Sequence, residues 1–218
     1  MIHAGRYSPG DQLPSEREIM EELGVGRSTV REAMLSLQKM GLATVKSGER
    51  ARVTAPTAQV LVHELSGAAR LLLAQQGGIQ RFQEARALFE IGLARLAAQI
   101  ATADDLARLK SALEANRLVM NDWAEFMRTD VAFHYVIATI PRNTIFTSLY
   151  NAVVEWLTEQ REISGRARRS AQLAYAAHER IYNAIAAHDA NEAQAAMHDH
   201  LEQVAKLYWQ VKSVKTDG

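Results

Sequence analysis

Two short amphipathic segments joined by a glycine-containing turn constrain this chain more than any other feature. Pro14 suits the first turn of a helix, where its missing N–H costs nothing, and Gly24 suits the end of that helix. A second helix is expected from about Ser28 to Gly41, because apolar residues recur there every three or four positions. A helix, a tight turn and a second helix with arginines in its first turns can place a helix in the major groove of DNA.

The composition indicates a globular and mainly helical protein. Hydrophobic residues make up 48% and charged residues 23%, while aromatic residues are only 6% and prolines number four. There is no cysteine, which excludes disulfides and thiolate metal ligands. No apolar run reaches the roughly 18–20 residues that a membrane helix needs, and the first residues do not begin a signal peptide. We therefore expect a cytoplasmic protein without membrane contact.

Charge is unevenly distributed although the total is balanced at 25 basic and 25 acidic residues. Residues 25–53 contain six Lys and Arg against two Glu, whereas residues 1–24 contain two Arg against five Asp and Glu. A neutral protein with one local basic patch suits docking at a defined DNA site better than coating nucleic acid.

The expected fold class is mainly α, with a winged helix-turn-helix domain followed by an all-α helical bundle. Two short β-prone runs, 42–45 and 51–53, flank a polar stretch and predict a hairpin, the wing. Short breakers between the later amphipathic segments imply antiparallel neighbouring helices. The basic stretch at 161–169 is interpreted as a solvated loop. The expected domains are 1–56 for DNA binding, 57–78 as a connecting helix or linker, and 79–212 for the bundle, whose helices lie near 79–101, 104–120, 122–139, 144–163, 170–188 and 190–212.

Arginines in and around the second helix are the candidate DNA contacts. Arg27 and Arg31 are four residues apart and share one helix face, and guanidinium groups bind guanine edges or phosphates. The run from Pro9 to Leu42 resembles the winged helix-turn-helix of GntR-family transcription regulators. The alternative is that these arginines pair with Glu18, Glu32 or other acids on solvated helices. The resemblance implies DNA contacts for Arg17, Arg27 and Arg31, the positive end of the second helix adds Ser28 and Thr29, and the wing tip adds Gly48 and Arg50.

The chain departs from the family's pattern in two places. Members usually have a further helix before the segment matched here by residues 5–10, and only four residues precede that segment. We therefore expect that the chain as given lacks its true start; the alternative is a DNA-binding unit with an under-covered core. The wing tip is usually Gly-x-Gly, whereas residues 48–50 read Gly-Glu-Arg, so Arg50 is the residue expected to reach a narrow minor groove.

One carboxylate and three histidines form a second candidate site. Asp130 and His134 stand at i and i+4 on one helix, while His178 and His200 lie in later helices. By themselves such residues are more often surface or satisfied core side chains. The stretch 79–212 is similar to the FCD domain, the effector-binding half of FadR-type GntR regulators. That resemblance implies that the four residues bind a divalent metal ion inside the bundle.

The ligand chemistry narrows the choice of ion and suggests an effector. Neutral imidazoles and one carboxylate suit zinc, nickel, manganese, cobalt or iron, and without thiolates the sequence does not select among them. Zinc is the first expectation, with the other four as alternatives. Open coordination positions would take water or the carboxylate of an organic acid. Arg86 and Glu90 match an Arg-x-x-x-Glu motif of the FCD domain, so Arg86 is the candidate effector-binding residue. The alternative for this pair is an ordinary salt bridge along one helix.

Several segments further resemble sialic-acid-responsive repressors of this family, among them residues 48–53 and 129–134. The function expected from these resemblances is a repressor that binds palindromic operator DNA as a homodimer. An organic acid, with sialic acid among the candidates, would shift it between DNA-competent and DNA-incompetent states. One alternative is a metal-dependent enzyme that uses the Asp/His cluster to activate water, which leaves the first 55 residues unexplained. Another keeps DNA binding but makes the metal purely structural.

Overall fold

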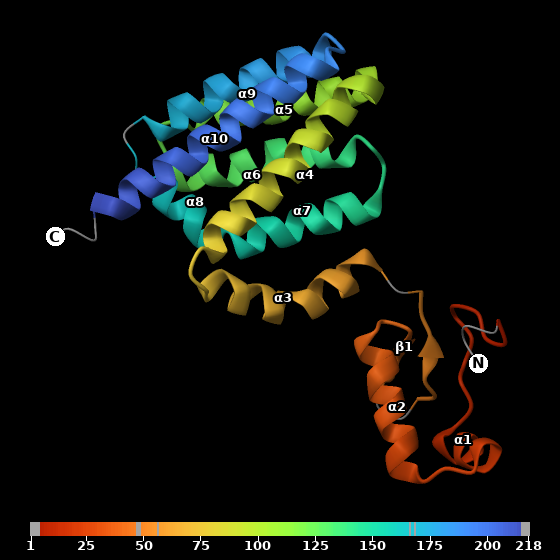
Figure 1. The fold of residues 1–218 in the computed structure, drawn as a ribbon. Helices are drawn as coiled ribbons and strands as arrows, with labels where there is room; N and C mark the ends of the chain where they lie inside the picture. Colours follow the sequence, from red (N-terminus) through yellow and green to blue (C-terminus); the bar gives the residue numbers. More distant parts are fainter. Residues whose placement is uncertain (1–4, 47–48, 56, 166, 168, 215–218) are drawn as a thin grey trace. The chain divides into compact units, whose positions relative to one another are not determined.

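A computed structural model describes residues 5–46, 49–55, 57–165, 167 and 169–214 (Figure 1). The chain divides into two units, Met1–Gly67 and Ala68–Gly218, each with its own hydrophobic core. Helix α3 (Ala58–Ala74) runs through the boundary between them. Within the described residues, no helix combines the length and the hydropathy that crossing a membrane would require.

The first unit opens with the helix-turn-helix. Ser15 caps helix α1 (Glu16–Leu23): its hydroxyl accepts the N–H of Glu18, and the Glu18 carboxylate accepts the N–H of Ser15 at 2.7 Å. This reciprocal arrangement satisfies two N–H groups that a helix start leaves unpaired. The helix therefore begins at Glu16, just after the expected Pro14. Gly24 ends it with φ 66°, a left-handed conformation that glycine adopts without Cβ strain.

The predicted hairpin follows helix α2 (Arg27–Lys39). Strands β1 (Ala43–Thr44) and β2 (Arg52–Val53) pair antiparallel, with Ala43 opposite Val53. Both lie inside the β-prone runs expected from the sequence, which confirms the wing. Gly48 at its tip lies outside the described residues.

A segment before α1 also lines up beside β2, which no sequence pattern predicted. Gln12 forms a bridge to Arg52, and the Leu13 N–H donates to the carbonyl of Ala51 at 2.8 Å. This pairing brings apolar side chains from distant parts of the unit into one small core. Its buried members are Leu13, Ala43, Ala51 and Val53, with Tyr7, Met34 and Leu37 packed against them.

The second unit is a bundle of helices, as expected. Helix α10 packs along α4 and α9, and α5 packs against α6 and α9 (Figure 1). The bounds are α4 (Gly78–Ile100), α5 (Ala103–Leu118), α6 (Trp123–Thr139), α7 (Thr144–Trp156), α8 (Thr158–Ser164), α9 (Ser170–Ala186) and α10 (Ala190–Val214).

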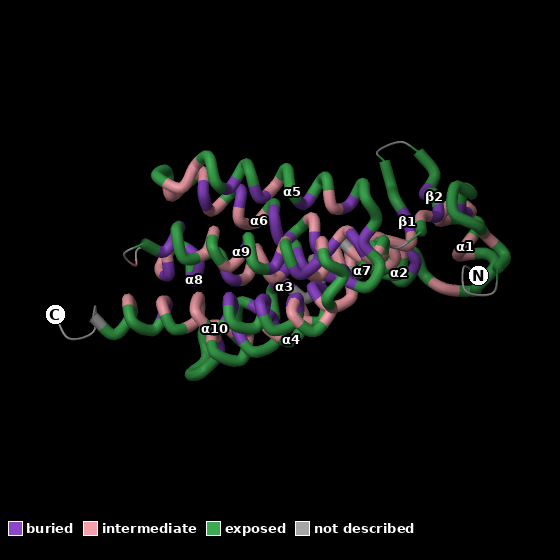
Figure 2. The backbone as a smooth tube through the Cα atoms, turned by 90° about the horizontal axis from the view of Figure 1, so that it is seen from above, coloured by how far each residue is buried: buried purple, intermediate pink, exposed green. Residues whose placement is uncertain are grey.

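Alanine allows the central helices of the bundle to approach each other closely. Ala94, Ala97 and Ala98 on α4 and Ala193 and Ala196 on α10 are almost completely buried. Alanine has the highest helix propensity and needs little space, so it favours both the helices and their close contact. Figure 2 shows buried residues alternating with exposed ones along these helices, the pattern of amphipathic segments.

The expectation of one helix over 144–163 is wrong. The chain turns at Leu157, which is 1% exposed, and this buried break separates α7 from α8. The interpretation of the basic stretch at 161–169 as a solvated loop is also wrong for Arg161 and Ser164. Both residues belong to helix α8 and are buried. A basic composition predicts that a segment is exposed to solvent. In this fold the guanidinium of Arg161 is buried instead, and the carboxylate of Asp130, 2.6 Å away, compensates its charge.

Asp105, in the first turn of α5, shows how a buried carboxylate is stabilised in this bundle. It accepts the N–H of Thr102 at 3.0 Å and a guanidinium nitrogen of Arg142 at 2.9 Å. Burial alone would raise the pKa of Asp105, but the hydrogen bonds from Thr102 and Arg142 outweigh it and lower that pKa below its ordinary value. The carboxylate therefore stabilises the fold above the pKa of the unfolded chain, and this contribution is lost as pH falls through the lowered folded-state pKa.

We predict that Asp105→Asn lowers the free energy of unfolding by about 1–3 kcal/mol at neutral pH. Urea denaturation followed by circular dichroism measures this loss. The difference from wild type should shrink as the pH is lowered below about 4, where the unfolded-state carboxyl is protonated. Asp104→Asn, at an exposed neighbouring position, is the matched control. Equal destabilisation by both substitutions would contradict the role given to Asp105.

Candidate metal centre and nucleic-acid interface

Three helices bring together the four predicted ligand residues. Asp130 and His134 come from α6, His178 from α9 and His200 from α10. One potential ligand atom from each residue lies within 4.8 Å of the others, and all three histidines are buried. The i, i+4 spacing placed the first two residues on one face, and helix packing supplied the other two.

Glu90 orients the imidazole of His134. Its Oε2 lies 2.6 Å from Nδ1 of His134, and its Oε1 accepts from Nε of Arg86 at 2.6 Å. Neither atom has a hydrogen-bond partner of good geometry within the described residues, so the contact is a close ion-pair distance. Because a carboxylate only accepts, the contact suits a proton on Nδ1, which would leave the lone pair of Nε2 for the cluster. Arg86 and Glu90 do form a salt bridge along α4, as the alternative interpretation expected, but it is buried and part of the site.

Asn116 orients the imidazole of His178 in the same way. The Asn116 amide donates to the Thr129 hydroxyl at 2.9 Å, which directs its oxygen toward Nδ1 of His178, also at 2.9 Å. Nδ1 therefore carries the proton and Nε2 faces the cluster. Nothing in the sequence pattern marked Asn116, because it stands on α5 at no motif spacing from the ligand residues.

The surroundings set the protonation states of the cluster. Burial lowers the pKa of His178 and lowers that of His200 further, because a charged imidazolium is poorly solvated inside the bundle. Burial would raise the pKa of Asp130, but the close contact with His178 and the charge of Arg161 hold that pKa well below its ordinary value. Neutral imidazoles beside an ionised carboxylate are the forms that bind metal ions.

The geometry of these groups fits a metal ion. A tetrahedral ion with bonds of about 2.0–2.1 Å separates its ligand atoms by about 3.3 Å. Nε2 of His134 lies 3.2 Å from Nε2 of His178, which in turn lies 3.3 Å from Oδ1 of Asp130. Within the described part of the chain, Nδ1 of His200 is buried and has no hydrogen-bond partner. The cluster could therefore hold a metal ion, whose identity the donor set leaves open.

A small cavity of about 40 Å³ adjoins the cluster. Asp130 and His200 form part of its wall, as does Arg86, the residue predicted to bind an effector. Arg161 of α8 also lines it, although the sequence placed this residue in a loop. The remaining lining residues are Trp123, Phe126, Met127, Ser164, Ser170, Ala174, Val204 and Leu207.

The predicted DNA-contacting residues lie on the first unit, around the start of α2. Gly26 precedes this helix and has no side chain that could cap it. The first N–H groups of α2 therefore receive no hydrogen bond from a capping side chain. Arg27, Ser28 and Thr29 in the first turn are all exposed. An uncapped helix start flanked by hydroxyls and a guanidinium is suited to bind phosphate.

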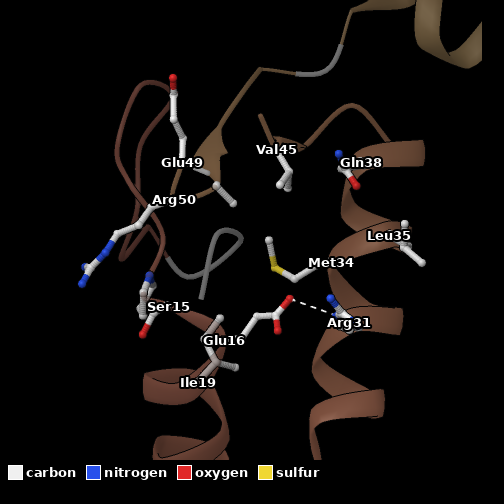
Figure 3. A pocket seen from close by; sticks show the side chains of 12 residues that line it. Ser15, Glu16, Ile19, Arg31, Met34, Leu35, Gln38, Val45, Glu49 and Arg50 are labelled. Atoms are coloured by element: carbon white, nitrogen blue, oxygen red, sulfur yellow. Dashed lines mark hydrogen bonds and ion pairs between the residues drawn. The ribbon is translucent and has the colours of Figure 1, made fainter. Parts of the chain in front are cut away.

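Several of the predicted arginines share acidic partners on α1. Nε of Arg27 lies 3.3 Å and Nε of Arg31 lies 3.4 Å from the two carboxylate oxygens of Glu16 (Figure 3 shows the Arg31 contact). Arg50, in the wing, contacts Glu18 at 3.5 Å. The alternative interpretation, pairing with acids on solvated helices, thus describes this unit as well. Exposed pairs of this kind contribute only about 0–1 kcal/mol, so phosphates can replace the carboxylates.

The remaining features of this unit concern Arg17 and a surface pocket. Arg17 contacts Glu21 at 3.5 Å, and its side chain is 84% exposed.

A pocket of about 660 Å³ lies between α1, α2 and the wing (Figure 3). Ile19, Met34 and Val45 are among its apolar lining residues. The expectation of a further helix upstream stays a prediction.

An N-terminal winged helix-turn-helix and a helical bundle with a buried Asp/His cluster define a class of transcription regulators with a DNA-binding and an effector-binding half. Comparison with protein families agrees. Residues 1–53 match "Bacterial regulatory proteins, gntR family", and residues 82–203 match the "FCD domain". The chain belongs to the GntR family of bacterial regulators, in the branch that carries an FCD domain.

Individual relatives agree with this assignment. The chain is 42% identical over 210 residues to the HTH-type transcriptional repressor NanR of Enterobacter sp. (strain 638), covering 95% of this chain and 81% of that protein. It is also 42% identical over 217 residues to NanR of Cronobacter sakazakii, covering 99% and 83%. The solved structure titled Streptococcus agalactiae GntR is 24% identical with a TM-score of 0.64, covering 94% of this chain and 93% of that one, and shows the shared fold.

These relatives decide between the classes of function. The chain is a DNA-binding transcription regulator, and the alternative of a metal-dependent enzyme is not favoured, because the relatives are named transcriptional repressors. An FCD domain is the effector-binding half of such a regulator, so an effector is expected to act on this chain.

Proposed function

We propose that this chain is a homodimeric repressor whose binding to palindromic operator DNA is controlled by a small carboxylate at a metal site. The observation that carries the proposal is the buried cluster of Asp130, His134, His178 and His200 beside a cavity, in a chain whose other unit presents arginines on an uncapped helix. Residues 1–56 would read DNA, 57–78 connect, and 79–212 sense the effector and dimerise. Such a regulator acts in the cytoplasm, where its operator is.

For DNA, we assign the base and phosphate contacts to the exposed residues at the start of α2. Arg27 and Arg31 would leave Glu16 and bind guanine edges or phosphates, while Ser28 and Thr29 would bind phosphate at the helix start. The remaining contacts would come from Arg17, from the wing residue Arg50 and from Gly48 at the wing tip. A two-fold symmetric dimer would double this small contact surface on a palindromic site.

We predict that Arg27→Ala or Arg31→Ala weakens operator binding by about ten- to a hundred-fold, because each loses a contact worth about 1–3 kcal/mol. Fluorescence anisotropy with a duplex selected by the wild type from a random library measures the dissociation constant. Arg128→Ala, an exposed position on α6 in the other unit, serves as the control. Unchanged affinity in both α2 variants would sink the assignment.

For the metal, Asp130, His134, His178 and His200 would be the ligands, with zinc the first choice and nickel, manganese, cobalt or iron as alternatives. When bound, the ion supplies a positive charge and coordination positions that attract a carboxylate. Glu90 and Asn116 hold two of the imidazoles with Nε2 directed inward, so the protein's own contribution is orientation. The adjoining cavity, lined by Arg86 and Arg161, favours a sensing site over a closed structural one.

We predict that His178→Ala purifies with much less bound metal than the wild type, since it removes one of four ligands. Elemental analysis of both proteins by mass spectrometry measures the metal content. His198→Ala is the matched control, because His198 lies on the same helix as His200 and its side chain is 60% exposed. Metal content that is equal in the wild type and the His178 variant would discard this ligand set.

For the effector, we propose sialic acid (N-acetylneuraminate), a sugar acid, on the strength of the resemblance to sialic-acid-responsive repressors and the similarity to the NanR proteins. Arg86 would pair with its carboxylate or a hydroxyl. Pockets for ligands of this size measure about 300–1,000 Å³, against a cavity of about 40 Å³ here. Binding would therefore require the cavity walls to move, which is a means of coupling the effector to the DNA-binding state.

We predict that N-acetylneuraminate weakens operator binding by the metal-loaded wild type about 5- to 150-fold, the range of typical allosteric coupling. Anisotropy titrations with and without the sugar acid measure this effect. N-acetylmannosamine, an uncharged sugar, should have no effect, and the His178→Ala variant should respond to neither compound. An operator affinity that the sugar acid leaves unchanged would rule it out as the effector.

A further inference from the structure

Arg161 combines burial, one strong ion pair and two unused donors. Its side chain is 9% exposed, and Nη1 donates to Oδ2 of Asp130 at 2.6 Å. Nε and Nη2 are buried and make no hydrogen bond within the described part of the chain. A buried charged group with unpaired donors is costly, and most buried polar groups are paired. The two donors therefore call for an acceptor in the adjoining cavity, either water or a ligand.

The position of the two donors defines the chemistry of that ligand. Nε–H and the near N–H of Nη2 lie on the same edge of the planar guanidinium and point in parallel directions. This edge matches the two oxygens of a carboxylate, which it binds through two charge-assisted hydrogen bonds. A neutral amide of the same shape offers one acceptor and one donor, so it fits the edge poorly.

The cavity beside Arg161 has the size and polarity for such a group. It measures about 40 Å³, which on the usual scale holds a few water-sized groups, and Arg86 contributes a second guanidinium to its wall. The hydroxyls of Ser164 and Ser170 donate to the carbonyls of Arg161 and Gly165, so their oxygens can still accept. The two guanidinium groups in the wall favour an anionic occupant.

Asp130 connects this cavity to the metal-ligand cluster. Its Oδ1 lies 3.3 Å from Nε2 of His178, whereas its Oδ2 holds Nη1 of Arg161. One carboxylate oxygen thus faces the cluster and the other fixes the guanidinium. Arg86, by contrast, has its Nε committed to Glu90 at 2.6 Å, which leaves Arg161 with the complete unused edge.

We propose that Arg161 is the carboxylate receptor of this regulator: its Nε/Nη2 edge binds the acid group of the effector beside the cluster. This inference rests on the proposed control by an acidic effector, but not on which acid it is. Arg161 would select for an acid over the corresponding amide, while Arg86 would contact another polar group of the effector. The substitution Arg161→Lys keeps the charge and removes the planar edge, so it separates the two contributions.

The test uses acetate, which is small enough for the cavity, and acetamide, its neutral counterpart of the same shape. Thermal midpoints of the full chain are measured against rising concentrations of each, with the metal bound and again after removal of the metal by a chelator. Acetate should stabilise the wild type in both forms, and acetamide in neither. Arg161→Lys and Arg161→Gln should weaken the apparent acetate affinity about ten- to a hundred-fold.

The matched control is Arg128→Lys, which should behave as the wild type. Arg128 is an exposed residue on α6 that forms an ion pair with Glu125. The inference is overturned if acetamide stabilises as well as acetate, if acetate acts only with metal present, or if the Arg161 variants respond as the wild type does. The wild-type arms can still overturn the inference if both Arg161 variants fail to fold. A parallel titration with N-acetylneuraminate tests the effector identity: no response to it, with an Arg161-dependent response to acetate, rejects sialic acid and retains the receptor.

Discussion

Two ion pairs buried in the helical unit, Arg86 with Glu90 and Arg161 with Asp130, organise the site around them. A charge inside a protein must be compensated, and removing one member of a buried pair typically costs about 3–5 kcal/mol. Each of the two carboxylates also contacts an imidazole of the cluster, Glu90 at His134 and Asp130 at His178. The carboxylates that make burial of the two guanidinium groups tolerable are therefore either part of the cluster or in direct contact with it.

This arrangement explains why the bundle can hold so many polar groups at its centre. Alanines along α4 and α10 bring the helices close together and leave little space for water. In such surroundings hydrogen bonds and ion pairs are stronger than in water, and unpaired groups are more costly. Asn116 illustrates the result, since it is fully buried and satisfied by Thr129 on one side and His178 on the other. Ligand side chains that neighbouring groups hold in a fixed orientation are what a binding site for an ion requires.

The arginines of the first unit obey the opposite rule. Arg27 and Arg31 share the carboxylate of Glu16 at the surface, where water screens the interaction and the pairing contributes little. Weak pairing keeps these side chains available, whereas the strong pairing of Arg161 holds one edge of its guanidinium in place. The same residue type thus suits two tasks, exchangeable contact with a nucleic acid and fixed presentation of a receptor, according to its burial.

The sequence by itself determined the elements whose signals are local. A capping residue and a glycine marked α1, apolar periodicity marked α2, β-prone runs marked the wing, and the spacing of Asp130 and His134 placed them on one helix face. Only the tertiary structure decided the contacts between distant segments: the pairing of Leu13 beside β2, the break at Leu157, and the convergence of Asn116 and Arg161 on the cluster. Periodicity and capping act over a few residues, whereas burial of a charge depends on a partner that packing brings from another helix. For that reason the basic stretch at 161–169 was predicted to be a solvated loop, whereas the fold buries its first arginine, Arg161.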